Sequence, residues 1–203
     1  RHYGITEETV GAPVLATMEV VQIGVTKDGL PVLIGKDAYE ADHIVVLNRI
    51  KSHTDFSGVI ESGLMKMLAI GLGKQKGANM YHRAFFRYGF EHVIRTVYQV
   101  VLASGKIVFG VGLIENAYGQ TARIAAMYAD ELEMMEQKLL AEAKKLSGRL
   151  PFDELDLLIV DKMGKNISGT GMDTKVIGRL MQNFEPEPEK PAPPRHEAPR
   201  PQS

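Results

Sequence analysis

Residues 48–82 contain the side chains of this chain that are best suited to chemistry. Lys66 stands there within a run of leucine, methionine and isoleucine, where a buried ammonium ion would be costly. Such a lysine must lose its proton, find a partner or carry a covalent group, unless its side chain reaches from a helix into solvent. A deprotonated amine would suit a Schiff base, and a modified one would be the attachment point of a cofactor.

Two histidines flank this lysine, and each suits a different task. His53 follows a predicted strand and stands close to Asp55, a setting that suits general acid–base chemistry near neutral pH. His82 lies four residues after Ala78, and a neutral imidazole there could bind nickel, zinc or iron. The alternative for each is an ordinary loop or surface histidine, which spacing alone does not exclude.

The segment Gly71–Gly77 is rich in glycine and lysine, as phosphate-binding loops are. It lacks the Gly-Lys-Ser/Thr ending of the Walker motif, and it follows a predicted helix instead of a strand. The N–H groups of a helix that begins near Ala78 could still bind an anion, with help from Lys74 and Lys76. The alternative is a helix end followed by a solvated turn.

Composition excludes several other kinds of function. The chain has 203 residues, a formal net charge of −1 and no basic cluster, so neither nucleic acid nor a membrane surface is an expected partner. It has no cysteine, which rules out disulfides, thiolate catalysis, iron–sulfur clusters and cysteine-bound zinc. No apolar run is as long as a membrane span and no signal peptide opens the sequence, so we expect a cytoplasmic protein.

Predicted strands and helices alternate along most of the chain, which indicates an α/β fold with a mixed or mainly parallel sheet flanked by helices. Strands are expected at residues 17–23, 31–34, 43–48, 106–113, 120–127 and 155–161. Helices are expected at residues 36–41, 61–70, 78–104 with a break near Gly89, and 129–146 with glutamates and lysines opposite its apolar stripe. Residues 43–48 are an apolar, β-branched run that is typical of a buried parallel strand, and residues 155–161 are expected to form a final buried strand.

Polar loops follow these two apolar strands, and ligands bind beyond the carboxyl ends of the strands in α/β sheets. Lys51 and His53 follow the first strand, while Lys162 and the loop 163–175 follow the second. We therefore expect the two loops to meet at one edge of the sheet. The glycines and hydroxyl groups of residues 166–171 could hold a ligand there, or form an ordinary tight turn.

The order of these residues resembles that of the nickel-pincer-nucleotide-dependent lactate racemase family, and more closely that of its uncharacterised relatives. The shared block reads HTDF-x-G-x-x-ESGL-x-KM-x-x-IGLGK-x-x-GA and leads to a histidine, which is His82 here. The likeness covers roughly residues 3–182. It implies that Lys66 holds the cofactor covalently through a thioamide bond, that His82 is the nickel ligand supplied by the protein, and that His53 is one of two catalytic histidines. Lys51, Lys74 and Lys162 would be cations for the cofactor phosphate or the substrate carboxylate.

The reaction implied by the resemblance is inversion at the α-carbon of a 2-hydroxy acid by an isomerase of the racemase or epimerase type. His53 would remove the hydroxyl proton while the α-hydrogen leaves as a hydride for the lysine-bound cofactor. The substrate would be lactate, a sugar acid or another hydroxy acid, and cofactor-synthesis enzymes would be partners. The interval from His53 to Lys66 is longer than in the lactate enzyme. In that family the second catalytic histidine lies upstream, so we expect this chain to be an N-terminally truncated fragment that is inactive alone.

The resemblance also divides the chain. Residues 1–184 would form the lactate racemase-like α/β region, with residues 1 to about 150 in the catalytic domain and about 151–184 beginning the next part. Residues 185–203 hold seven of the ten prolines and no aliphatic residue larger than alanine, so they are predicted to be a disordered tail.

Two other functions stay open at this stage. Lys66 could form a Schiff base in an aldolase- or dehydratase-like enzyme, which borohydride trapping with a carbonyl substrate would reveal. The chain could instead be a non-catalytic module that binds an anion or nucleotide, in which case Lys74→Ala would weaken binding and His82→Ala would not.

Overall fold

Two separate sheets carry the strands that the structure describes. The computed structural model describes residues 4–54, 56–152, 154–168 and 171–177. Its elements, in chain order, are α1 (Glu7–Val10), β1 (Val20–Val25), β2 (Pro31–Gly35), α2 (Lys36–Glu40), β3 (Ile44–Arg49), α3 (Leu64–Lys66), the π-helix η1 (Met67–Gly71), α4 (Lys74–Tyr88), α5 (Phe90–Ala103), β4 (Ile107–Glu115), β5 (Thr121–Tyr128), α6 (Leu132–Leu146) and α7 (Lys165–Ser168).

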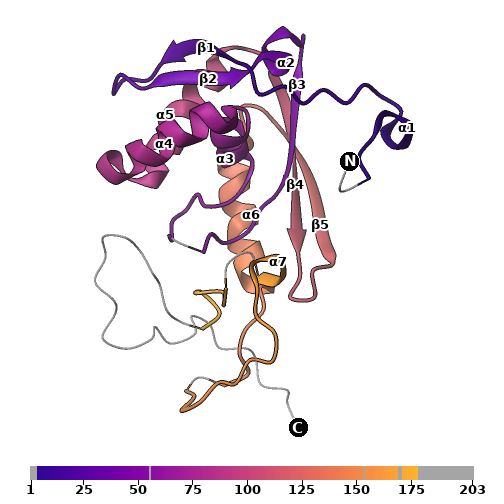
Figure 1. Cartoon of the computed structure of the whole chain (residues 1–203), viewed down its shortest axis with the longest axis vertical. Helices are drawn as coiled ribbons and strands as arrows, with labels where there is room; N and C mark the ends of the chain where they lie inside the picture. The colour runs from indigo at the N-terminus through magenta and orange to yellow at the C-terminus, as the bar shows by residue number, and fades with distance from the viewer. Residues whose placement is uncertain (1–3, 55, 153, 169–170, 178–203) are drawn as a thin grey trace.

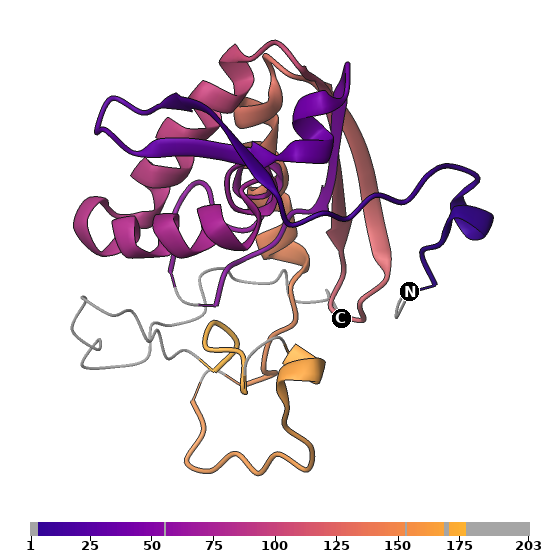
Figure 2. The same ribbon diagram turned by 45° about the horizontal axis from the view of Figure 1, so that its top comes forward.

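The larger sheet has the order β3-β4-β5, in which β3 and β4 are parallel and β4 and β5 antiparallel. The parallel pair needs a long crossover, and the helices α3 to α5 supply it. The second sheet is the antiparallel hairpin β1-β2, which lies across α4 and α5 (Figures 1 and 2). The predicted α/β class with a mixed sheet flanked by helices is therefore confirmed.

The inner face of the β3-β4-β5 sheet forms the core together with α3 and α6. Val46 and Met127 are buried on this face, and between them the glycines of β4 allow the helices to approach closely. A Cβ on Gly110 would lie 2.8 Å from Leu64 Cδ1, and one on Gly112 would lie 2.6 Å from Ile50 Cδ1. The helix that carries Lys66 is thus packed directly against the sheet.

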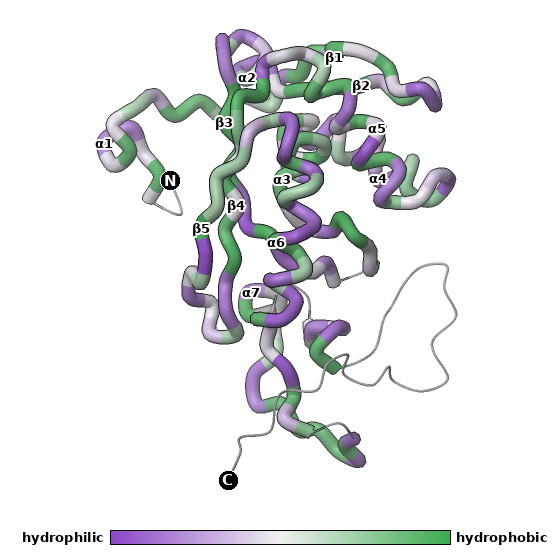
Figure 3. The backbone as a smooth tube through the Cα atoms, turned by 180° about the vertical axis from the view of Figure 1, so that it is seen from behind, coloured by the Kyte–Doolittle hydropathy of each residue, from purple (hydrophilic) through white to green (hydrophobic). Residues whose placement is uncertain are grey.

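The outer face of the same sheet is apolar but exposed. Leu47 is 63% exposed and Ile124 65%, and much of β3 and β4 is coloured as hydrophobic in Figure 3. Helices α3 to α6 lie on the other side (Figure 1). For the buried parallel strand predicted at residues 43–48, the parallel pairing is confirmed, but the burial is wrong for the outward-facing residues that the structure describes.

The strand predicted at residues 155–161 is absent: the described residues there are irregular. Leu157 is 75% exposed and Ile159 83%. A continuous apolar run forms a strand when neighbouring strands and covering layers bury it. The described part of the chain supplies neither around this segment, which extends away from the sheets in Figures 1 and 2.

Helix boundaries differ from the predicted ones near the Gly-rich segment. The predicted helix 61–70 begins only at Leu64 and continues as a π-helix, and α4 begins at Lys74 instead of near Ala78. The break at Gly89 is confirmed, with a φ of +79° that favours glycine. Among the residues described, no helix is both long and apolar enough to cross a lipid bilayer.

Tyr81 ties α4 to the hairpin. Its fully buried hydroxyl accepts a hydrogen bond from the backbone N–H of Leu33 at 3.0 Å and donates one to the carbonyl oxygen of Pro31 at 3.3 Å.

Tyr81→Phe should lower the free energy of unfolding by about 1–3 kcal/mol, because it leaves the buried Leu33 N–H without its partner. Urea denaturation measures this. Tyr98→Phe is the control and should cost less, because the Tyr98 hydroxyl only donates a long hydrogen bond of 3.4 Å to the Ala129 carbonyl and accepts no backbone N–H from the described residues. Equal losses in the two variants would contradict the assignment.

Candidate functional site

His53 lies in the loop between β3 and α3. The loop is closed at its base by Lys51 and Ser62, which exchange backbone hydrogen bonds of 2.9 and 3.2 Å. The half-buried imidazole of His53 stacks on the ring of Phe56 at a centroid distance of 4.1 Å and lies 5.8 Å from the ring of Phe90. Two aromatic neighbours therefore define the position of the ring.

Three phenylalanines from different elements form an aromatic cluster, which we define as Phe56, Phe85 and Phe90. Phe90, the first residue of α5, lies 3.6 Å from Phe56 and 4.7 Å from Phe85 of α4 between ring centroids. The helix break at Gly89 separates Phe85 of α4 from Phe90 of α5, and Phe90 contacts both the loop of His53 and the Phe85 ring.

Lys66 ends α3 beside this cluster. Its Nζ lies 5.8 Å from the centroid of the Phe90 ring, a contact that stabilises an ammonium group. The preceding Leu64 and Met65 are fully buried, whereas Lys66 is half-buried. Lys66 therefore lies at the edge of the apolar core, with its ammonium group beside the Phe90 ring. A π-helical turn follows immediately, and such turns are frequent at functional sites.

His82 lies on the exposed side of α4 and contacts the aromatic cluster from another direction. Its ring meets Phe85 edge-on at 5.1 Å, and its Nδ1 lies 2.7 Å from the carbonyl oxygen of Ala78. An Nδ1–H that donates to this carbonyl leaves the lone pair on Nε2, which is the arrangement of metal-binding histidines. The cluster thus connects His53, Lys66 and His82.

The other predicted cations are placed differently. Lys51 and Lys162 are exposed. Lys74 begins α4 with a φ of +53°, and its stem packs on Gly35, where a Cβ would lie 2.6 Å from Lys74 Cε. Asp55 and residues 169–170 of the predicted ligand-binding loop lie outside the described residues, as does the predicted tail 185–203.

The Gly-rich segment is a packed helix junction. A Cβ on Gly73 would lie 2.8 Å from the Ala69 carbonyl oxygen, and one on Gly77 would lie 3.2 Å from the Tyr81 ring. The Gly77 N–H already donates to the Gly73 carbonyl at 2.8 Å. These glycines permit close packing, and the predicted row of anion-binding N–H groups from Ala78 onward is wrong, since Ala78 is already inside the helix.

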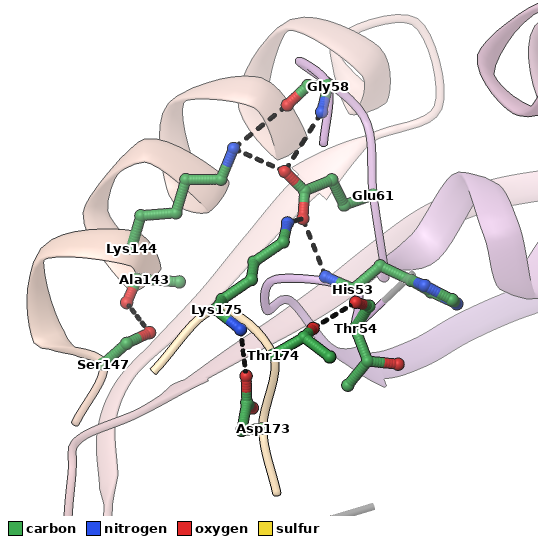
Figure 4. A network of polar contacts seen from close by, with 10 residues as sticks. All are labelled: His53, Thr54, Gly58, Glu61, Ala143, Lys144, Ser147, Asp173, Thr174 and Lys175. Carbon is green, nitrogen blue, oxygen red and sulfur yellow. Dashed lines mark hydrogen bonds and ion pairs between the residues drawn. The ribbon is translucent and has the colours of Figure 1, made fainter. Parts of the chain in front are cut away.

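Glu61 is a residue that the sequence analysis missed. Its carboxylate is fully buried and lies within 2.5 Å of Lys144 Nζ and 2.6 Å of Lys175 Nζ (Figure 4). It also accepts the backbone N–H groups of His53 at 2.7 Å and Gly58 at 3.2 Å. Burial alone would raise the pKa of Glu61, but the hydrogen bonds from Lys144, Lys175 and His53 outweigh it and hold the pKa below its ordinary value.

The loop 163–175 does reach the loop of His53. Thr174 Oγ1 donates to the carbonyl oxygen of Thr54, and Lys175 pairs with Glu61 (Figure 4). The expected meeting of the two loops is therefore confirmed through Thr174 and Lys175, although the described residues before the second loop form no strand.

Glu136 of α6 is a second missed carboxyl. The sequence placed the glutamates of this helix on its polar face, but Glu136 is buried, and its Oε2 accepts the Met65 N–H at 2.8 Å. Burial raises the pKa of Glu136 to about 7. A Cβ on Gly63 would lie 2.4 Å from Glu136 Oε1, so only glycine fits between this carboxyl and the helix of Lys66.

No group of three or more potential protein ligands that could hold a metal ion occurs among the residues that the structure describes. A metal bound at His82 would therefore take further donors from a cofactor, from substrate or from other parts of the protein.

Comparison with known proteins finds a family model that matches part of the chain. Residues 12–91 match the model of the lactate racemase N-terminal domain, and this range contains His53, Lys66 and His82. The lactate racemase apoprotein from Thermoanaerobacterium thermosaccharolyticum is similar in structure, with 19% identity and a TM-score of 0.47 over 59% of this chain. The match spans 30% of that protein's length. No curated protein matches the chain. The resemblance noted in the sequence is confirmed over residues 12–91.

Proposed function

We propose that this chain is part of a racemase or epimerase that inverts the α-carbon of a 2-hydroxy acid. Three observations support the proposal together: the match of residues 12–91 to the lactate racemase N-terminal domain, the identity of the residues, and their geometry. The geometry carries most of the weight, because Lys66, His82 and His53 come from three elements and lie against one aromatic cluster.

The donor groups fit a nickel-pincer nucleotide. Lys66 offers an amine at the edge of the core for covalent attachment, and His82 offers Nε2, with its tautomer set by the Ala78 carbonyl. When bound, the cofactor would supply an acceptor for the hydrogen that leaves the α-carbon as a hydride.

The roles of the protein side chains follow from their positions. His53 would take the proton from the substrate hydroxyl, because its imidazole suits proton transfer near neutral pH and is held by Phe56 and Phe90. The aromatic faces would keep water from the reacting carbon. Lys74 and Lys162 would bind the cofactor phosphate or the substrate carboxylate, as would Lys51.

Covalent attachment gives the sharpest test. The full chain, co-expressed with the cofactor-synthesis enzymes, should gain mass at Lys66 and contain about one nickel per chain. Intact and peptide mass spectrometry with metal analysis measure both quantities.

Two variants separate the proposed roles. Lys66→Arg should remove the adduct and the nickel, whereas His82→Ala should keep the adduct and lose most of the nickel. Wild-type protein that gains neither mass nor nickel would contradict the proposal. Mass trapped at Lys66 by borohydride with a carbonyl compound would favour the Schiff-base alternative.

A further inference from the structure

Glu61 takes no direct part in the proposed reaction, but its buried carboxylate needs an explanation. A fully buried carboxylate is costly unless all its oxygen atoms are satisfied. Here Oε2 accepts from the His53 N–H and Lys175 Nζ, and Oε1 accepts from the Gly58 N–H and pairs with Lys144 Nζ. The donors come from the loop itself, from α6 and from the segment 171–177 (Figure 4).

The two backbone contacts hold the loop at two points along its length. His53 and Gly58 lie on either side of Phe56, the residue on which the imidazole of His53 stacks. Lys144 also fixes Gly58 directly, because its Nζ donates a hydrogen bond of 3.0 Å to the Gly58 carbonyl oxygen. A single carboxylate thereby fixes the backbone that aims the His53 ring into the aromatic cluster.

Negative charge matters for this arrangement. Hydrogen bonds to a carboxylate are about twice as strong as those between neutral groups. A glutamine at this position would keep the shape but would present an NH₂ group to one pair of donors. Its amide oxygen could serve only the other pair.

We propose that Glu61 is the positioning residue for His53, and that Lys144 and Lys175 hold its carboxylate in place from α6 and from the segment 171–177. The importance of this for catalysis rests on the proposed role of His53, but the positioning itself does not.

The test is NMR spectroscopy of the full chain without cofactor. The Cε1–H resonance of His53, assigned with a His53→Gln variant, should be displaced by the Phe56 ring in the wild type. In Glu61→Gln it should move toward the position of a free histidine, and exchange of the His53 and Gly58 amide protons should accelerate about tenfold or more. Glu142→Gln is the matched control, since it removes a carboxylate of α6 that pairs with Arg123 and should change neither signal.

A folded Glu61→Gln protein with the wild-type His53 resonance and unchanged amide exchange would overturn the inference. If Glu61→Gln does not fold, Lys175→Met provides the second measurement, with a smaller displacement of the same sign. An unmoved His53 resonance in that variant would likewise overturn it.

Cofactor-loaded enzyme that also supplies the second catalytic histidine, which is expected upstream of this chain, separates this inference from the proposed function. Glu61→Gln should keep the nickel content and the KM, while kcat falls about a hundredfold because the base is misplaced. A raised KM together with a lower nickel content would instead mean that Glu61 holds the whole site, and would overturn the positioning role. Absence of nickel from the wild type would refute the proposed function and leave the NMR result standing.

Discussion

Glu61→Met is expected to lower the free energy of unfolding by about 3–5 kcal/mol, the usual cost of removing one partner from a buried ion pair. Methionine fills a similar volume, so the loss would come from the cations left behind. Lys175 is only 18% exposed in its side chain and cannot hydrate fully, whereas Lys144, at 40%, can turn toward solvent. Urea denaturation at pH 7, followed by circular dichroism, measures the change.

A double-mutant cycle supplies the control for this prediction. In Glu61→Met/Lys175→Met both members of the buried pair are gone, so the loss should be smaller than the sum of the single losses. Additive losses would show that the pair contributes nothing and that the effect comes from the loop alone.

Acid pH gives an independent check on the same carboxylate. The folded-state pKa of Glu61 lies below its ordinary value of 4.5, so its contribution is present above that pH and is lost as pH falls through the folded pKa. The stability difference between wild type and Glu61→Met should therefore shrink below pH 4.5. A difference that stays constant into acid would contradict the ionised, paired carboxylate.

The sheet and its crossover could be predicted from periodicity because the relevant signals are local. The strand predicted at residues 106–113 is found as β4 (Ile107–Glu115), and Gly89 breaks the long helix as expected. Segment 155–161 has an equally strong apolar pattern and forms no strand. A local sequence pattern indicates only that a segment would be stable as a strand if other parts of the protein buried it. Whether such parts are present depends on the tertiary structure.

The residues of the candidate site could be predicted from the sequence, but the packing that brings them together could not. The order of His53, Lys66 and His82 is readable along the chain, whereas Phe56, Phe85 and Phe90 meet only after the helices pack. Glu61 stood at the expected start of a helix, and nothing local distinguishes a solvated first-turn carboxylate from a buried one.

Glu136 did leave a signal in the sequence. It stands four residues after Leu132 and three before Leu139, which places it on the apolar stripe of the helix. A carboxyl on such a stripe is either paired or protonated, and this one accepts a backbone N–H from the helix of Lys66 without a cation. Its Oε1 has no hydrogen-bond partner among the described residues.

Glu136→Gln should therefore be more stable than the wild type at alkaline pH. The folded-state pKa of Glu136 is about 7, above its ordinary value of 4.5, so the native state binds more protons than the unfolded state between these values. Wild-type stability consequently falls as pH rises through this window, and the ionised carboxylate costs about 3 kcal/mol above pH 7. Glutamine keeps an acceptor for the Met65 N–H and does not titrate, so the variant avoids this loss.

Urea denaturation at pH 4.5, 6, 7 and 8.5 measures the effect as a difference between variant and wild type. The difference should grow from pH 4.5 to pH 8.5 by about 3 kcal/mol. Glu142→Gln, which changes a partly exposed carboxylate on the same helix, should show no comparable growth. A difference for Glu136→Gln that does not change with pH would mean that the carboxyl ionises normally, either through a cation or through water that reaches Oε1. The gap that Gly63 leaves beneath the helix of Lys66 would then be a hydrated site and not a dry contact.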